Sequence, residues 1–293
     1  MKISGTNFAV LAAIFIGISV IAGAEASKQI NPVAVACISL ILSVIFLIPL
    51  SFILRERIKI KELIRKNLKN ATANMLLRSV LGNIFLYLGF SLTSAIKAVF
   101  LLGFEPAFVV IIGFILLKEK ISLKQIILIF LIIAGAFLLS TNGRWDIFST
   151  AQIGDLLIII ALFLFACSYI PAQDVVKKTN SATLTVFSNL VGGLILIPIA
   201  FIVFNVNVQS LNLTHSVLIL IFANTILFSV FGLFCFYNAL KSTKKWIVSS
   251  LLQLAPIPGA IIAYIWLGDT LNFVQLVGAG IILVSSYLIA REH

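Results

Sequence analysis

Charged residues are scarce in this chain: only 11% of its 293 residues are Asp, Glu, Lys or Arg, whereas 61% are hydrophobic. A soluble domain covers its surface with charged side chains, so a mean hydropathy of +1.18 excludes an ordinary soluble fold. The apolar runs match the thickness of a bilayer core. They are too long and too evenly apolar for the alternating strands of a membrane barrel. The composition therefore predicts an all-α, multi-pass membrane protein.

Histidine and cysteine are also rare. The two histidines lie at a loop edge and at the last position, and the three cysteines fall singly inside apolar runs. The sequence has no HExxH motif, no glycine-rich phosphate loop and no aspartate-rich metal motif. We therefore expect neither an enzyme nor a metal or cofactor site, and the cysteines imply no disulfide framework.

Apolar runs long enough to cross a bilayer occur ten times. They lie at roughly 7–25, 32–54, 72–91, 96–117, 123–140, 153–173, 183–204, 216–240, 246–267 and 273–290. The first run also resembles a secretory signal, with Ala22-Gly23-Ala24 in the place of a cleavage site. We expect it to be retained as a helix, because it has a counterpart deep in the chain, at 153–173.

Lys and Arg outnumber Asp and Glu by 21 to 10. Counted from a cytoplasmic N-terminus, 17 of the 21 basic residues fall on the cytoplasmic side, and the opposite side has only Lys28, Lys97 and Arg144. The remaining one, Arg78, lies inside a run. This bias follows the positive-inside rule and predicts that both termini are cytoplasmic. The basic charge therefore reflects membrane topology, and we expect no nucleic-acid partner.

The chain contains an internal repeat. At a shift of 150, residues 87–139 align with 237–289 without a gap, and 12 of the 53 pairs are identical. A shift of 149 aligns earlier parts, including LIPL at 47–50 with LIPI at 196–199. Each half thus holds five runs, and an odd-numbered unit repeated in tandem must enter the membrane from opposite sides. We expect two inverted five-helix repeats, 1–144 and 145–293, with a substrate site between them near the midplane.

Four prolines form matched pairs between the halves, Pro49 with Pro198 and Pro106 with Pro256. A proline inside a helix removes a backbone hydrogen bond and can kink the helix. Prolines are also common in ordinary membrane helices. Their matched positions favour shaped or hinged helices in both halves.

The stretch SLTSAIKAVFLLGFEPAFVVIIGFILLKEKISLKQ (91–125), echoed by a stretch ending LGDTLNFVQLVGAGIILV, resembles the drug/metabolite transporter superfamily, EamA-like branch. Leu117-Lys118-Glu119 stands where that family often has Leu-Gly-Glu, and the second half has Leu267-Gly268-Asp269. The resemblance covers almost the whole chain in two copies. It implies ten helices with both ends cytoplasmic and secondary transport of small metabolites across the plasma membrane.

Two charges lie inside apolar runs. Glu105 is near the middle of its run, where an ionised acid costs about 3 kcal/mol, so we expect it to bind a substrate amine, a proton or another cation. Alternatively, a neutral Glu105 hydrogen-bonds a neighbouring helix or the carbonyl freed by Pro106. Arg78 could pair with Glu105 or hold an anionic substrate group. Its position about 9 Å from the cytoplasmic interface favours snorkelling or a structural ion pair.

Uncharged polar residues inside the runs are further candidates. Gln253, one turn before Pro256, is our second choice for a cavity residue. The other candidates for substrate or ion binding are Asn83, Tyr87, Tyr169 and Asn224, for which hydrogen bonding between helices is the alternative. The basic segment 55–70 is either a plain loop or a surface helix. Gly278 and Gly280 are expected to allow close helix packing.

Taken together, these features predict a secondary transporter of small polar metabolites, such as amino acids, that works by alternating access. Proton or cation coupling would supply the energy, because the sequence has no ATP-binding motif. The alternatives are an exporter of drugs or lipophilic cations, a non-transporting membrane scaffold and an integral membrane enzyme without a recognised motif. The oligomeric state stays open.

Overall fold

The computed structural model describes residues 4–93, 95–146, 153–207, 211–259, 261 and 272–291. All regular secondary structure in these residues is helical. Nine helical stretches among them are long and apolar enough to cross a membrane: Gly5–Gln29, Pro32–Ile53, Ile60–Leu92, Phe100–Leu117, Leu123–Thr141, Ile153–Lys178, Ser181–Ile202, His215–Ser242 and Phe273–Ala290. The expected run 246–267 lies partly outside the described residues, and the motif Leu267-Gly268-Asp269 lies entirely outside them. The all-helical membrane fold is confirmed.

The first half contains α1 (Gly5–Gln29), α2 (Pro32–Ile53), α3 (Ile60–Asn74), the π-helix η1 (Met75–Gly82), α4 (Asn83–Leu92), α5 (Ala95–Leu102), α6 (Glu105–Leu117) and α7 (Leu123–Thr141). The second half contains α8 (Ile153–Lys178), α9 (Ser181–Ile202), α10 (His215–Asn224), the π-helix η4 (Thr225–Gly232), α11 (Leu233–Ser242), α12 (Lys245–Leu252) and α14 (Phe273–Ala290). The two π-helices are therefore 150 residues apart.

Helix starts are set by side-chain caps that also recur between the halves. The Ser122 hydroxyl accepts a hydrogen bond from the Gln125 backbone, and the Gln125 side chain accepts one from the Ser122 backbone. Asn272 and Gln275 form the same capping box at the start of α14, 150 residues later. Each box satisfies two backbone donors that have no partner within the helix. The last helix of each half therefore begins at an equivalent residue.

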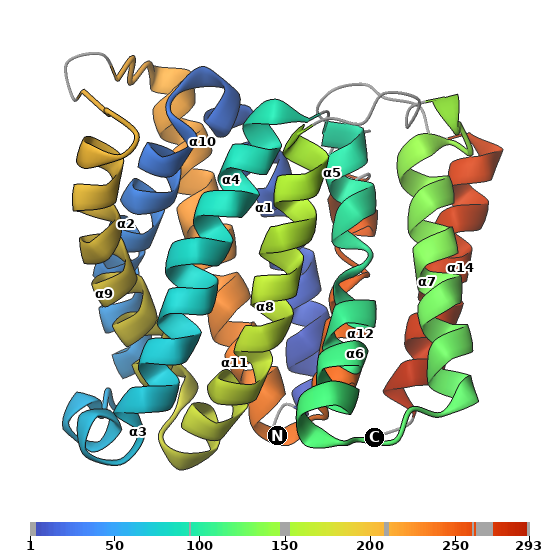
Figure 1. Ribbon diagram of the computed structural model, residues 1–293, viewed down its shortest axis with the longest axis horizontal. Helices are drawn as coiled ribbons and strands as arrows, with labels where there is room; N and C mark the ends of the chain where they lie inside the picture. The colour runs from blue at the N-terminus through green and yellow to red at the C-terminus, as the bar shows by residue number, and fades with distance from the viewer. Residues whose placement is uncertain are drawn as a thin grey trace.

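The two halves are related as inverted repeats. In Figure 1, α1 and α8 run in opposite directions through the bundle, and so do α7 and α14. The packing is also mirrored: α7 packs on α14 and α2 packs on α9, while α4 contacts α8 as α11 contacts α1. Most contacts between the halves thus either join two equivalent helices or belong to a matched pair. The expected inverted arrangement is confirmed.

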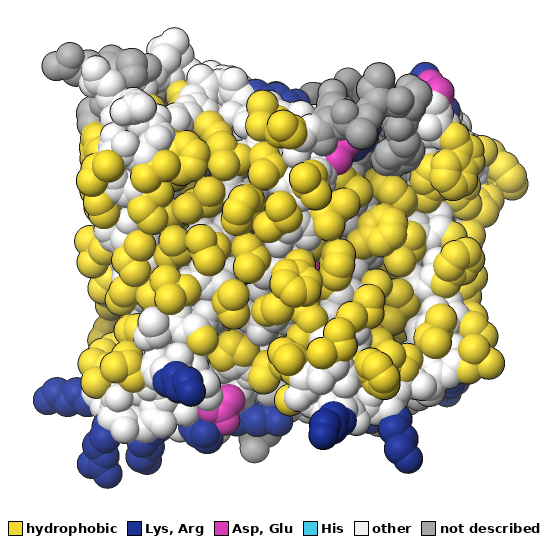
Figure 2. All heavy atoms as spheres, viewed as in Figure 1, with side chains coloured by type: hydrophobic (Ala, Val, Ile, Leu, Met, Phe, Trp, Pro, Cys, Tyr) yellow, Lys and Arg dark blue, Asp and Glu magenta, His cyan; other side chains and the backbone are white. Residues whose placement is uncertain are grey.

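The outer surface carries a broad hydrophobic band. Phe52, Phe114, Phe130 and Phe273 are more than half exposed on it, as side chains facing lipid would be. Lys and Arg side chains gather at one end of the bundle (Figure 2), and this is the end where α1 begins and α14 finishes (Figure 1). The distribution matches a protein embedded in a bilayer with one strongly basic face.

The basic segment before the third span is more ordered than a plain loop. Helix begins at Ile60, so the third stretch runs from Ile60 to Leu92 rather than from about 72 to 91. Backbone angles of φ −145° and ψ 19° at Asn67 kink α3. Leu63 is fully buried against the bundle while Ile64 is half exposed. The segment is therefore helical from Ile60 onward rather than a plain loop.

Close packing of α14 on α7 predicts different outcomes at two neighbouring glycines. A Cβ at Gly278 would lie 2.6 Å from the Leu139 backbone nitrogen and 2.7 Å from the Gly135 carbonyl oxygen. Backbone atoms cannot yield, so Gly278→Ala should destabilise the protein by about 1–3 kcal/mol. At Gly280 nothing lies within 4 Å of such a Cβ.

Gly280→Ala is therefore the matched control, and its stability should be unchanged or slightly raised. Thermal unfolding of the purified variants in one detergent measures both effects. Equal unfolding temperatures for the two variants would show that α7 and α14 do not touch at Gly278.

Candidate functional site

The fourth span of the first half is broken. Helix α5 ends at Leu102, Gly103 and Phe104 form a turn, and α6 begins at Glu105. Pro106 lies in the first turn of α6, where its missing N–H would have had no helical partner. Glu105 thus lies within its apolar run as expected, but at the start of a helix rather than inside a continuous one. Its carboxylate lies at a helix N-terminus, where the helix dipole favours negative charge.

The second half has a corresponding break. Helix α12 ends at Leu252, residues 253–255 form a turn, and residues 256–259 are helical again. Pro256 is therefore the first residue of a helical segment, and Pro106 lies in the first turn of one. These two prolines mark interruptions between helices and do not kink continuous ones. The other pair differs, because Pro49 lies inside α2 and Pro198 inside α9.

The two breaks lie close to each other and to α1. A Cβ at Gly103 would lie 3.9 Å from Oε1 of Gln253, the C-cap residue of α12. A Cβ at Gly17 would lie only 2.0 Å from the Ala255 carbonyl oxygen, so α1 packs directly on the second break. Gln253 is 4% exposed, which fits its expected interior position. Paired discontinuous helices of this kind surround substrate sites in inverted-repeat transporters.

Arg78, Glu105 and Tyr169 are all buried, with exposed fractions of 4%, 8% and 0%. The Arg78 guanidinium carbon lies 4.6 Å from the centre of the Phe165 ring and 4.3 Å from that of Phe236. Such contacts stabilise a desolvated cation by about 2 kcal/mol. The interpretation that Arg78 snorkels to the interface is therefore wrong, because aromatic rings hold its head group inside the bundle.

These buried groups retain unused hydrogen-bonding capacity. Nε and Nη1 of Arg78, Oε1 of Glu105 and the Tyr169 hydroxyl have no hydrogen-bond partner among the described residues. Arg78 and Tyr169 both lie near Glu105, although neither makes an aligned hydrogen bond to its Oε1 atom. A buried polar group without a partner is costly. The group thus combines one basic, one acidic and one hydroxyl side chain, each with a polar atom that lacks a partner among the described residues.

Tyr87 and Asn224 belong to a hydrogen-bond network between the halves. The Asn224 side-chain amide donates to the Tyr87 hydroxyl at 2.7 Å and to the Ser39 hydroxyl at 3.1 Å. All three residues are buried. These hydrogen bonds connect α10 of the second half to α2 and α4 of the first. They match the alternative interpretation of Tyr87 and Asn224, hydrogen bonding between helices.

A second network, related to the first by the internal repeat, also joins the two halves. The Asn74 amide donates to the Tyr237 hydroxyl at 3.0 Å and to the Ser188 hydroxyl at 3.1 Å. Sequence reasoning did not single out these three residues. A signal was present, because extending the 150-residue shift backwards pairs Asn74 with Asn224 and Gly82 with Gly232. The two halves are therefore joined by two equivalent hydrogen-bond networks.

Both network asparagines stand directly before a π-helix, Asn74 before η1 and Asn224 before η4. A π-helical turn inside an α-helix often marks a functional position, because it redirects the side chains that follow. Arg78 lies within η1, and Asn83, 4% exposed, is the first residue after it. The π-helix thus places Arg78 in the interior.

Ion pairs join the halves at the two ends of the bundle. Lys97 of α5 pairs with Asp155 of α8 at 3.3 Å, and Thr93 donates a hydrogen bond to the same carboxylate. Lys245 of α12 pairs with Glu119, which follows α6, at 3.1 Å. Among the described residues, no group of three or more His, Cys, Asp or Glu side chains could hold a metal ion.

Comparison with known proteins agrees with this geometry. Residues 3–141 and residues 152–291 each match the EamA-like transporter family. A solved crystal structure has the same fold over 98% of both chains, with a TM-score of 0.77 at 12% sequence identity. The family model matches twice, once in each half, in agreement with the internal repeat.

Similar curated proteins include two uncharacterized archaeal transporters. One, from Archaeoglobus fulgidus, is 29% identical over 71% of this chain and 72% of its own length. Another, from Methanothermobacter thermautotrophicus, is 26% identical over 96% of this chain and 84% of its own length. A WAT1-related chloroplastic protein of Arabidopsis thaliana is 29% identical over 70% of this chain and 50% of its own length.

The mirrored networks predict equal energetic coupling on the two sides of the molecule. Hydrogen bonds between membrane helices contribute about 0.6 kcal/mol on average and up to about 1.7. Double-mutant cycles of Asn224→Ala with Tyr87→Phe, and of Asn74→Ala with Tyr237→Phe, should each give a coupling energy in that range. Thermal or denaturant unfolding in detergent measures it.

Thr225→Val is the control for these cycles. Thr225 follows Asn224, is fully buried, and its hydroxyl has no partner among the described residues. Its isosteric replacement should leave stability unchanged or raise it. Coupling energies near zero in both cycles would contradict the networks.

Proposed function

The chain belongs to the EamA-like transporter family, and from that premise we propose that it moves small polar metabolites, such as amino acids, across the plasma membrane by alternating access. It is a multi-pass membrane transporter and not an enzyme, as its family and its transporter-named relatives indicate. The observation that carries the finer proposal is the buried group of Arg78, Glu105 and Tyr169 with unpaired polar atoms beside a broken helix.

The chemistry of Arg78, Glu105 and Tyr169 fits a small molecule that carries a positive and a negative charge. Glu105 accepts a substrate ammonium group or a coupling proton or cation, while Nε and Nη1 of Arg78 donate to an anionic group. Tyr169 and Gln253 supply neutral polar contacts, and Asn83 follows the π-helix that positions Arg78. Tyr87 and Asn224 act on the site through the network that joins the halves. A large lipophilic cation suits this interior less well, because Arg78 would repel it.

The moving units are the two repeats, 1–144 and 145–293. Substrate that binds one arrangement of the halves better than the other shifts the inward and outward populations. A gradient of the substrate or of a coupled ion supplies the energy. The mirrored contacts between the halves support this mechanism, since an inverted repeat can exchange the conformations of its two halves.

Both termini are proposed to lie in the cytoplasm. The basic residues gather at the end of the bundle where α1 begins and α14 finishes (Figures 1 and 2), and the positive-inside rule assigns that end to the cytoplasm.

Glu105→Gln tests the site directly. Losing a charged hydrogen bond to the substrate costs about 1.5–3 kcal/mol, so transport should fall about 10- to 100-fold. The measurement is counterflow of a labelled amino-acid panel in proteoliposomes at several imposed pH gradients. The control is Glu25→Gln, which removes an exposed acid paired with Lys28 at 2.8 Å and should leave flux unchanged.

Unchanged flux and unchanged pH dependence in Glu105→Gln, at equal reconstituted amounts, would exclude a role for the charge. If the unmodified protein shows no saturable counterflow with any amino acid, the proposed substrate class is wrong. No saturable flux with any metabolite panel would favour a scaffold.

Orientation has its own test. In a variant whose native cysteines are replaced, an impermeant maleimide added to intact cells should label Trp145→Cys, which replaces a side chain that is 75% exposed. It should label Lys61→Cys, at the exposed basic end, only after the cells are opened. The reverse pattern would place the termini outside.

A further inference from the structure

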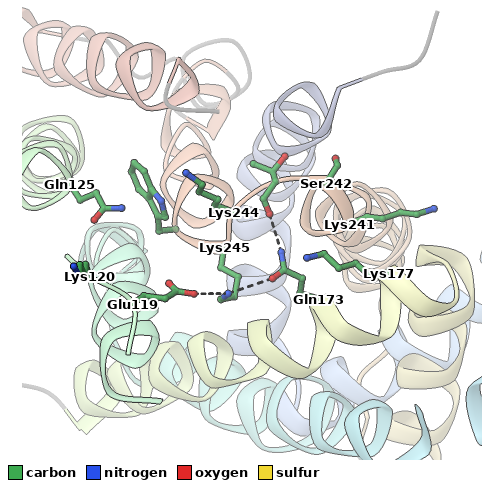
Figure 3. A pocket seen from close by; sticks show the side chains of 11 residues that line it. Glu119, Lys120, Gln125, Gln173, Lys177, Lys241, Ser242, Lys244 and Lys245 are labelled. Atoms are coloured by element: carbon green, nitrogen blue, oxygen red, sulfur yellow. Dashed lines mark hydrogen bonds and ion pairs between the residues drawn. The ribbon is translucent and has the colours of Figure 1, made fainter. Parts of the chain in front are cut away.

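A pocket of about 430 Å³ opens at the basic end of the bundle, between the two halves (Figure 3). Its volume falls within the range of small-molecule sites. Its charged lining consists of one acid and five lysines: Glu119, Lys120, Lys177, Lys241, Lys244 and Lys245. The pocket is distinct from the buried group around Glu105, which lies at the break between α5 and α6.

The positive charge of this pocket is only partly neutralised. Glu119 pairs with Lys245 at 3.1 Å, but Lys120, Lys177 and Lys244 form no ion pair among the described residues. Like charges brought together around a partly enclosed space repel each other and raise the local concentration of anions. The lining therefore favours an anionic occupant.

One ammonium group is held in place for such an occupant. Nζ of Lys245 contacts Oε1 of Glu119 and, at 3.4 Å, Oε1 of Gln173, and dashed lines mark both contacts in Figure 3. The Gln173 amide in turn donates to the carbonyl oxygens of Leu240 and Thr243, at 2.9 and 3.1 Å. The Lys245 side chain is 13% exposed, so its head group is fixed rather than mobile in solvent.

The start of α12 adds a second attraction. The helix begins at Lys245, and its N-cap residue, Lys244, makes no side-chain capping hydrogen bond. The first backbone N–H groups of a helix lack helical partners and attract anions. The first residues of α12 and the lysine side chains therefore border the same pocket.

We propose that this pocket binds a small molecule through a carboxylate or phosphate group, and that this group takes the place of Glu119 on Lys245. Glu119 comes from the first half of the chain and Lys245 from the second, so displacement of Glu119 removes an ion pair between the halves. Anion binding is thus linked to loosening of the basic end of the bundle. The binding itself does not depend on the proposed amino-acid transport.

The test is titration calorimetry with glycerol 3-phosphate, at constant ionic strength, on the full chain in phosphatidylcholine nanodiscs. Binding should be saturable. Lys245→Gln should weaken it about tenfold, the equivalent of one charged hydrogen bond. Glu119→Gln should strengthen it several-fold because the competing carboxylate is gone, and a gain of affinity cannot come from misfolding. The control, Lys61→Gln, removes an exposed lysine of α3 outside the pocket and should change little.

A lipid head group carries the same chemistry, and a second arm separates the two sources. If phosphatidylglycerol in the nanodisc weakens binding to the unmodified protein more than to Lys245→Gln, a head group occupies the anion site. If both are affected equally, the site serves a soluble anion. The proposal is overturned if binding is not saturable in phosphatidylcholine, if Lys61→Gln weakens it as much as Lys245→Gln, or if Glu119→Gln does not strengthen it.

Discussion

A polar group inside a bilayer must find its partner within the protein, and this constraint accounts for the architecture. At the breaks, Gly103–Phe104 and residues 253–255, each backbone N–H bonds a carbonyl three residues earlier, so the turns keep their backbone donors satisfied within the chain. Both breaks lie in the interior, one next to Gln253 and the other against Gly17 of α1. The same requirement draws the asparagine amides into networks between helices. Burial of polar groups therefore determines which helix faces meet.

The polar contacts inside the bundle also bear on movement of the two halves relative to each other. Hydrogen bonds between membrane helices are individually weak, about 0.6 kcal/mol on average. The two networks and the two end ion pairs connect the halves at several separate points, and each can be exchanged without unfolding a helix. Because the repeat mirrors most of these contacts, a rearrangement at one end of the bundle has an equivalent at the other. Arg78 and Glu105 have no charged counterpart in the second half, where Phe228 and Ala255 stand, and this asymmetry supports the proposal that they bind the ligand.

Sequence reasoning located the helices well and their interruptions poorly. Apolar length reports the thickness of the membrane, but a broken span is as apolar as a continuous one. The sequence Gly103-Phe104-Glu105-Pro106 is compatible with a continuous helix and with an interrupted one. Arg78 was misjudged because a distance along a helix axis says nothing about which way the helix faces. Aromatic rings from α8 and α11 decide that the side chain stays inside.

By itself, the sequence determined the fold class, the internal repeat and the side of the bundle on which basic charge gathers, because each depends on composition or on periodicity along the chain. Only the tertiary structure decided the pairing of Asn224 with Tyr87, the isolation of the polar atoms of Arg78 and Glu105, and the lysine-lined pocket. The hydrogen bond between Asn224 and Tyr87, for example, joins residues 137 positions apart. Helix rotation and packing bring them together, and no local pattern of residues encodes that rotation.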